Sequence, residues 1–286
     1  MEKTNFGLLP KEFSSYKTGK FVVLSIPYEK TTTYIKGTGN GPSAIIAASA
    51  NMELYDEELK KNTAEEVGIA TLDALVIDGV GKEMVEKVKN SCLKVLKDKK
   101  IPIVLGGEHS ISLGCVLAAK EKYGKISVLQ LDAHSDLRDS YEDSIYNHAC
   151  VMKRIREHCD AVQVGIRSLS DEEAELIKEK KLNVFFAHEM RKKNFTKEIL
   201  SKLRENVFIT IDMDFFDPSL IPSVGTPEPG GFLWYETLDF LREIIKEKKV
   251  VGFDVVELCP NKINKAPDFI TAKFIYKIIG YISENF

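Results

Sequence analysis

Three residues that can bind a metal or carry a proton close an apolar run near the middle of the chain. Asp132, His134 and Asp136 stand at every second position of the stretch LQLDAHSDLRD, residues 129–139. Residues i, i+2 and i+4 of an extended strand share one face, so all three would start on the same side. Burying such groups without partners costs several kcal/mol per charge, and Arg138 is the one cation nearby in the sequence. A divalent cation would balance them.

Two further polar groups also follow apolar runs. Residues 206–212 lead into Asp212 and Asp214, with Asp217 just beyond, and a third run ends in two glycines before His109. The glycines allow the backbone to turn tightly after a strand. Ligands of open α/β sheets bind outside the carboxyl ends of the strands. We therefore expect the three groups to converge on one crevice.

The ligand count indicates two metals rather than one. Two histidines and four aspartates are too many for a single site that must also hold a substrate, but they suit two ions that share bridging carboxylates. Oxygen-rich donors with some imidazole favour Mn²⁺ over Zn²⁺. Two such ions about 3.5–4 Å apart can hold a water as hydroxide at neutral pH. A single D-x-D is often only a turn or a helix cap, and the three clusters together carry the prediction.

Apolar runs rich in β-branched residues predict the strands that position these groups, at residues 21–26, 67–72, 102–107, 126–132, 161–166, 182–187, 206–212 and 250–258. Most are continuous rather than alternating, which is typical of parallel strands covered on both faces. Helical periodicity lies between them, at 82–98, 170–181, 196–204, 235–248 and 267–284. This alternation predicts one domain over residues 1–286, an α/β three-layer sandwich with a parallel eight-stranded sheet. A (β/α)8 barrel is the alternative that the sequence leaves open.

Composition narrows the class of protein. The net charge is −3 and the lysines lie in mixed-charge runs, which provides no basic face for nucleic acid. No apolar run of about 18 residues predicts a membrane span, and the N-terminal segment lacks the apolar centre of a signal peptide. The five cysteines show no C-x-x-C spacing, which favours a reducing compartment over a disulfide framework. We therefore expect a cytoplasmic protein.

Six motifs together resemble those of the ureohydrolase family, which includes arginase and agmatinase. They are GTGNGPSAI (37–45), GGEHS (106–110), DAHSD (132–136), TIDMDFFDP (210–218), GTPEPGG (225–231) and DVVELCP (254–260). The resemblance covers nearly the whole chain. It implies the sandwich fold described above, two Mn²⁺ ions per subunit, hydrolysis of a guanidino group to urea and an amine, and a homotrimer or homohexamer.

The resemblance also implies a role for each matching residue. His109 and Asp136 would hold one metal, His134 and Asp214 the other, and Asp132 and Asp212 would bridge them. Asp136 would in addition orient the hydroxide. Two more residues take catalytic roles by the same resemblance: Glu257 would bind the guanidinium group, and His148 would shuttle protons. Structural roles are the alternatives for these two, and His158 and His188 match no motif.

The substrate is predicted from the loop 137–147. It lacks the small polar run with which arginases bind a carboxylate, and it carries Asp139, Glu142 and Asp143 against Arg138. Acidic groups favour a cationic tail, so we expect agmatine as substrate, with Asp139 among the residues that bind it. The alternative is that these acids only solvate a surface loop.

Arginase, guanidinobutyrase and formimidoylglutamase are the alternative activities, and a zinc deacetylase or a non-catalytic relative is less favoured because no ligand is missing. Thr210 departs from the usual serine of its motif.

Overall fold

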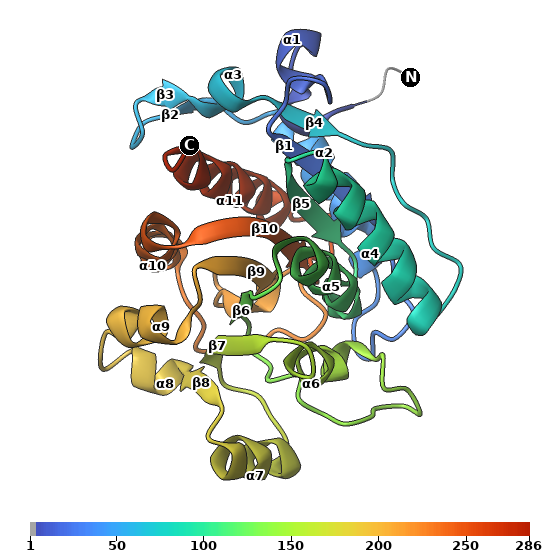
Figure 1. Ribbon diagram of the computed structural model, residues 1–286, viewed down its shortest axis with the longest axis vertical. Coiled ribbons are helices and arrows are strands. Elements are labelled where there is room, and N and C mark those ends of the chain that lie inside the picture. The colour runs from blue at the N-terminus through green and yellow to red at the C-terminus, as the bar shows by residue number, and fades with distance from the viewer. Residues whose placement is uncertain (1–3) are drawn as a thin grey trace.

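Eight strands form one parallel sheet at the centre of the computed structural model, which describes residues 4–286 (Figure 1). Their order across the sheet is β4-β1-β5-β10-β9-β6-β7-β8. The bounds are β1 Phe21–Ile26, β4 Ile69–Thr71, β5 Ile101–Gly106, β6 Ser127–Leu131, β7 Asp160–Ile166, β8 Asn183–Phe186, β9 Asn206–Asp212 and β10 Lys249–Val256. The edge strands β4 and β8 pair with one neighbour each, so the sheet is open. The predicted sheet is confirmed and the barrel is excluded.

Helices cover both faces of this sheet, as Figure 1 shows with α4, α5 and α6 on one side and α9, α10 and α11 on the other. The bounds on the first side are α4 Lys82–Lys97, α5 Ser112–Tyr123 and α6 Val151–Arg156, and on the second α9 Thr196–Lys202, α10 Trp234–Glu247 and α11 Ala266–Ser283, with α2 Gly41–Ser49 packed on α11. The shorter elements are α1 Lys11–Ser14, α3 Thr63–Val67, α7 Asp171–Lys180, α8 Ala187–Met190 and the hairpin β2 Tyr55–Asp56 with β3 Lys61–Asn62. Five single 3-10 turns lie within the described residues: η1 Phe6–Leu8, η2 Thr38–Asn40, η3 His109–Ile111, η4 His148–Cys150 and η5 Met213–Phe215.

The two helical layers explain why the strands read as continuous apolar runs. In β1, Val22 and Leu24 belong to the core that includes α4 and α5, while Phe21 and Val23 belong to the core that includes α10 and α11. Because each face of the sheet is covered, alternate residues are buried on opposite sides and no polar alternation is left.

Helix α5 was not predicted from the sequence. Most of its residues are buried, so it has no polar face and no clear period. Gly114 allows the helix to approach α4 closely, because a Cβ there would lie 2.7 Å from the carbonyl oxygen of Val85. Cys92 and Cys115 face each other across this contact with their Sγ atoms 3.7 Å apart, and all five cysteines are free, as the sequence indicates.

A buried ion pair ties the hairpin to the long C-terminal helix. Lys277 donates to Asp56 at 3.0 Å and to Glu58 at 2.8 Å, and its side chain is 3% exposed. Burial raises the pKa of Asp56, but hydrogen bonds from Leu59 and Lys277 outweigh that effect and lower it. Within residues 4–286 there is no helix both long and apolar enough to cross a membrane. Residues 1–3 of the expected N-terminal segment lie outside the described residues.

Candidate metal centre and active site

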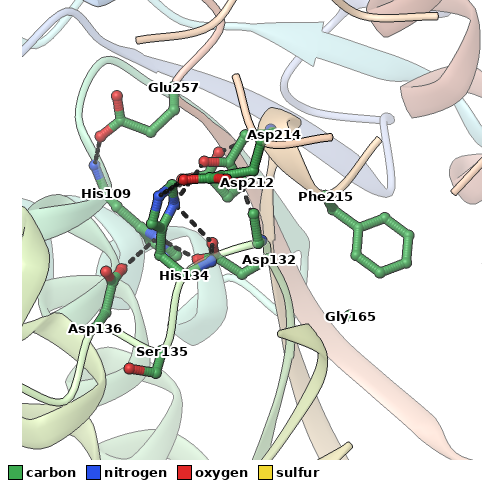
Figure 2. A network of polar contacts seen from close by, with 12 residues as sticks. His109, Asp132, His134, Ser135, Asp136, Gly165, Asp212, Asp214, Phe215 and Glu257 are labelled. Carbon is green, nitrogen blue, oxygen red and sulfur yellow. Dashed lines mark hydrogen bonds and ion pairs between the residues drawn. The ribbon is translucent and has the colours of Figure 1, made fainter. Parts of the chain in front are cut away.

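Four adjacent strands deliver the predicted ligands to one place. In the order β5-β10-β9-β6, the chain leaves β5 toward His109, ends β9 at Asp212 and leaves β6 toward Asp132. All these carboxyl ends lie at the same edge because the strands are parallel. Figure 2 shows the two histidines and four aspartates gathered there, with Glu257 above them. The convergence predicted from the three motifs is therefore observed.

The distances divide these side chains into two groups that share one carboxylate. His109 Nδ1 lies 3.1 Å from Asp132, 3.2 Å from Asp136 and 3.4 Å from Asp212. His134 Nδ1 lies 2.8 Å from Asp214 and 3.8 Å from Asp132. Ligand atoms of His109, Asp132 and Asp212 form one set compatible with a metal, and those of Asp132, His134 and Asp214 form another. Asp132 thus lies between two candidate sites.

The donor set fits a pair of divalent cations. Burial and the neighbouring carboxylates raise the pKa of Asp132 to about 7 and that of Asp212 well above its usual range. Burial lowers the pKa of His109 and His134, but the surrounding carboxylates outweigh it and raise both well above the usual range. These acids cannot all be ionised together without added positive charge. The buried Nδ1 of His109 makes no hydrogen bond within the described residues, although three carboxylates lie within 3.4 Å of it. A metal shared with those carboxylates would give this nitrogen a partner.

His109 is held from behind by a buried relay. Its Nε2 lies 2.9 Å from Thr210 Oγ1, and Thr210 in turn donates to Asp254 Oδ1 at 2.6 Å. The Thr210 hydroxyl can therefore accept the Nε2 proton, so that Nδ1, which faces the cluster, is the nitrogen that a metal would take. Burial raises the pKa of Asp254 to about 6. Partners of this kind orient metal-binding histidines and strengthen their basicity.

Arg167, which follows β7, holds the loops that surround Asp214. Its guanidinium donates to the main-chain oxygens of Asp214 at 2.6 Å, Glu228 at 2.9 Å and Pro229 at 3.0 Å. Burial raises the pKa of Asp214, but the charge and hydrogen bond of His134 outweigh it and lower that pKa to about 2. Asp214 therefore remains ionised beside His134.

Two of the acidic residues have backbones in the left-handed region. Asp136 has φ +52° and Glu257 has φ +63°, and residues other than glycine keep such strain mainly where the surroundings require it, often at functional sites. Glu257 Oε1 accepts a hydrogen bond of 2.7 Å from the main-chain nitrogen of His109. Burial first, and then the charge of Glu108, raise the pKa of Glu257 well above its usual range. A cationic group bound at this carboxylate would offset that repulsion.

A cavity of about 180 Å³ opens above the cluster. Its lining includes His109, His134, Asp136, Asp212, Asp214 and Glu257, and on the facing wall Thr32–Ile35, Arg138, Tyr141, His148 and Thr226. His148 is thus placed at the cavity as the sequence indicated. Asp139 is not: its carboxylate is 82% exposed and pairs with Arg154 at 2.9 Å. Glu142 and Asp143 do not line the cavity either, so the acidic residues of the loop give no structural support for a cationic substrate tail.

The sequence missed several residues around the site. Thr210 was noted only as a departure from a motif, and Asp254 and Arg167 were not singled out. Asp254 lies inside the DVVELCP motif but has no metal-ligand spacing, and Arg167 ends an apolar strand as a single cation. Their partners lie 44 and 47 residues away, so no local pattern could identify them.

An open parallel sheet with acids and histidines at its carboxyl edge defines an α/β protein with a candidate binuclear metal centre. Comparison with known proteins agrees: the arginase family model matches residues 19–281. An N(1)-aminopropylagmatine ureohydrolase from Synechocystis sp. is 41% identical, over 96% of this chain and 95% of its own. An agmatinase from Pyrococcus horikoshii is 34% identical, over 92% of each chain. The crystal structure of the agmatine ureohydrolase of Thermoplasma volcanium superposes with a TM-score of 0.88 at 30% identity, over 99% and 96% of the two chains.

The chain therefore belongs to the arginase family. Its fold and its class, a ureohydrolase that acts on guanidino compounds, are those that the motifs predict.

Proposed function

We propose that this protein hydrolyses the guanidino group of an agmatine-type alkylguanidine to urea and an amine, with two Mn²⁺ ions per subunit at the acidic cluster. The observation that supports it best is Glu257, a buried carboxylate that lines the same cavity as the cluster. A carboxylate binds a planar guanidinium through two charge-assisted hydrogen bonds. One domain per subunit, a homotrimer or homohexamer, and a cytoplasmic location belong to the same proposal.

The metals would be held by His109, Asp132, His134, Asp136, Asp212 and Asp214. When bound, two Mn²⁺ ions make a water acidic enough to act as a nucleophile and offset the negative charge of the cluster. Glu257 orients the guanidinium so that its carbon faces the cluster, and the Asp136 carboxylate accepts the proton of the attacking water. His148 donates a proton from Nε2 to the leaving nitrogen as its bond to carbon breaks.

The substrate we propose as preferred is N(1)-aminopropylagmatine, with agmatine, the substrate expected from the sequence, as the second. The relative named N(1)-aminopropylagmatine ureohydrolase is 41% identical to this chain, whereas the agmatinase is 34% identical. Tyr34 and Tyr141 line the cavity, and Tyr34 is 73% exposed at its mouth. Aromatic faces attract ammonium groups. A longer cationic tail can extend over these rings toward solvent.

One observation favours a substrate that bears a carboxylate, as an arginase or guanidinobutyrase would use. Arg138 lines the cavity, with its guanidinium 5.0 Å from the centre of the Tyr141 ring. A cation at this wall would attract a carboxylate and repel an ammonium group.

The test is product release from N(1)-aminopropylagmatine, agmatine, arginine, 4-guanidinobutyrate and formimidoylglutamate. The metal-free protein is loaded with Mn²⁺, and urea is measured, or formamide for the last compound. We expect kcat/KM to be greatest for the two agmatine-type compounds. Faster turnover of arginine or guanidinobutyrate would overturn the substrate proposal and identify Arg138 as the carboxylate-binding group, with loss of that preference in Arg138→Gln. No turnover of any compound would overturn the proposed function itself.

A further inference from the structure

Thr31 connects the proposed proton donor to a buried glutamate on the far side of the cavity wall. The main-chain nitrogen of His148 donates to Thr31 Oγ1 at 3.0 Å, and His148 Nδ1 lies 3.3 Å from the same oxygen. Thr31 Oγ1 donates to Glu108 Oε1 at 2.7 Å. The three residues thus form a chain of hydrogen bonds although 117 positions separate Thr31 from His148.

Glu108 is well placed to hold this chain in one arrangement. Its side chain is fully buried, and its Oε2 accepts hydrogen bonds of 2.6 Å from the main-chain nitrogens of Lys30 and Thr31. Ser110 donates to the other oxygen at 2.5 Å. Because Glu108 directly precedes His109, these bonds tie the 30–31 turn to the segment that carries a proposed metal ligand. The position of Thr31 is therefore set relative to the metal centre.

The direction of each bond determines the proton on the His148 ring. The single hydroxyl proton of Thr31 is given to the Glu108 carboxylate, which can only accept when ionised. Thr31 Oγ1 then offers only lone pairs to His148, so Nδ1 must carry the ring proton that faces it. The other ring nitrogen, Nε2, is left to exchange a proton with a group in the cavity.

A second contact restrains the ring from another side. Tyr141 meets His148 edge to face, with ring centres 6.5 Å apart and an angle of 87° between the planes. This contact limits rotation of the imidazole but does not distinguish its two nitrogens. Selection of the protonated nitrogen is thus left to Thr31.

We propose that Thr31, oriented by Glu108, is a positioning residue for His148: it selects the Nδ1–H form of the imidazole and aims Nε2 at the leaving nitrogen. Glu108 lies within the GGEHS motif but was given no role by it, and Thr31 lies outside every motif recognised in the sequence. The inference rests on the proposed function, because it takes His148 as the proton donor.

The test is a double-mutant cycle measured on the Mn²⁺-loaded protein with the best substrate of the panel. Thr31→Val keeps the shape of the side chain and removes the hydroxyl. We expect kcat to fall about tenfold or more, within the range of general acid catalysis, with KM changed less than about twofold. In a His148→Asn background the same substitution should change kcat less than about twofold. The dissociation constant for Mn²⁺ should stay within about twofold of wild type, and Thr31→Ser should restore kcat.

The control is Thr32→Val in the same two backgrounds. Thr32 has the same chemistry one position away, but its hydroxyl donates to Glu29 at 3.2 Å rather than to Glu108. Thr32→Val should therefore change kcat by the same factor in the wild-type background and in the His148→Asn background. Thr31→Ala provides the same comparison if valine disturbs the turn.

Each outcome bears on a separate statement. If Thr31→Val lowers kcat by the same factor in the wild-type and the His148→Asn backgrounds, Thr31 does not act through His148. Its role is then merely structural and the inference is overturned, while the proposed function stands. Full activity of His148→Asn would overturn the inference together with the role of His148. A wild-type protein that turns over none of the panel compounds would instead overturn the proposed function.

Discussion

Replacing Thr210 by valine should weaken metal binding through a residue that touches no metal. The Thr210 hydroxyl lies between His109 Nε2 at 2.9 Å and Asp254 Oδ1 at 2.6 Å, and all three side chains are buried. Valine removes this partner from both. His109 Nε2 is left as a buried group without a hydrogen bond, which costs about 1–3 kcal/mol, while Asp254 keeps hydrogen bonds with Ser112 and Ile211. We therefore expect the free energy of unfolding of the metal-free protein to fall by about 1–3 kcal/mol.

The same substitution frees His109 to rotate or to place its proton on Nδ1. Loss of such a supporting partner lowers metal affinity by about 10–100-fold, which corresponds to about 1.4–2.7 kcal/mol. The assay is titration of metal-free protein with Mn²⁺, together with urea unfolding. Thr210→Ser, which keeps the hydroxyl, should retain Mn²⁺ affinity within about twofold.

A buried threonine that contacts neither the cluster nor its cavity gives the matched control. Thr271 donates to the carbonyl oxygen of Pro267 at 2.8 Å inside α11 and is fully buried. Thr271→Val should lower the free energy of unfolding by about 1 kcal/mol and leave Mn²⁺ affinity unchanged. If Thr210→Val also left Mn²⁺ affinity unchanged, the assignment of the relay to His109 would be wrong.

Three further substitutions have expected outcomes. Glu257→Gln can still accept the hydrogen bond from the main chain but loses the charge, so kcat/KM should fall roughly 10–100-fold with Mn²⁺ affinity retained. Gly165→Ala should lower the free energy of unfolding by about 3 kcal/mol in urea unfolding, because φ is +87° and the new Cβ would lie 2.5 Å from the Phe215 ring (Figure 2). Lys277→Met leaves the buried Asp56 carboxylate unpaired and should cost about 3–5 kcal/mol at pH 7. This difference from wild type should narrow in acid.

The acid dependence follows from the depressed pKa of Asp56 in the folded protein. A lowered folded pKa contributes stability above the unfolded pKa, and that contribution is lost as pH falls through the folded value. The free energies of unfolding of wild type and Lys277→Met should therefore show the whole difference at pH 7, and this difference should disappear as the pH falls below about 4. A constant difference across this range would contradict the ion pair as its cause.

Two matched controls isolate the causes given for these effects. Gly124 has φ +74°, but no neighbouring atom lies within 4 Å of the place that a Cβ would take, so Gly124→Ala should cost only about 1 kcal/mol. Lys273 donates to the carbonyl oxygen of Glu53 at an exposed position, so Lys273→Met should cost less than about 1 kcal/mol at either pH. If Gly124→Ala lowered the free energy of unfolding as much as Gly165→Ala, the contact with the Phe215 ring would not be the cause. If Lys273→Met lowered it as much as Lys277→Met, the unpaired buried charge would not be the cause.

Local patterns predicted the parts of the site that depend on neighbours in the chain. Asp132, His134 and Asp136 reach one cluster because they directly follow β6 at the carboxyl edge of the sheet. The strand itself ends at Leu131 and Asp136 has φ +52°, so strand alternation does not place all three. Asp139 shows the limit of such reasoning. Its negative charge led to the prediction that it binds a cationic substrate tail, but its carboxylate accepts a hydrogen bond from Arg154, fifteen residues away. An exposed loop has no periodicity that states which way a side chain turns.

By itself the sequence determined an α/β fold, the positions of all eight strands and the residues of the acidic cluster, because burial on two faces and metal-ligand chemistry restrict residue types locally. That the sheet is open rather than closed into a barrel came from the tertiary structure. Only the tertiary structure decided that β10 lies between β5 and β9, which brings Glu257 over the cluster. It also decided the partners that orient the histidines, Thr210 for His109 and Thr31 for His148. The physical reason is that strand order and crossovers join segments about a hundred residues apart, and a hydrogen bond between them leaves no periodic trace in either segment.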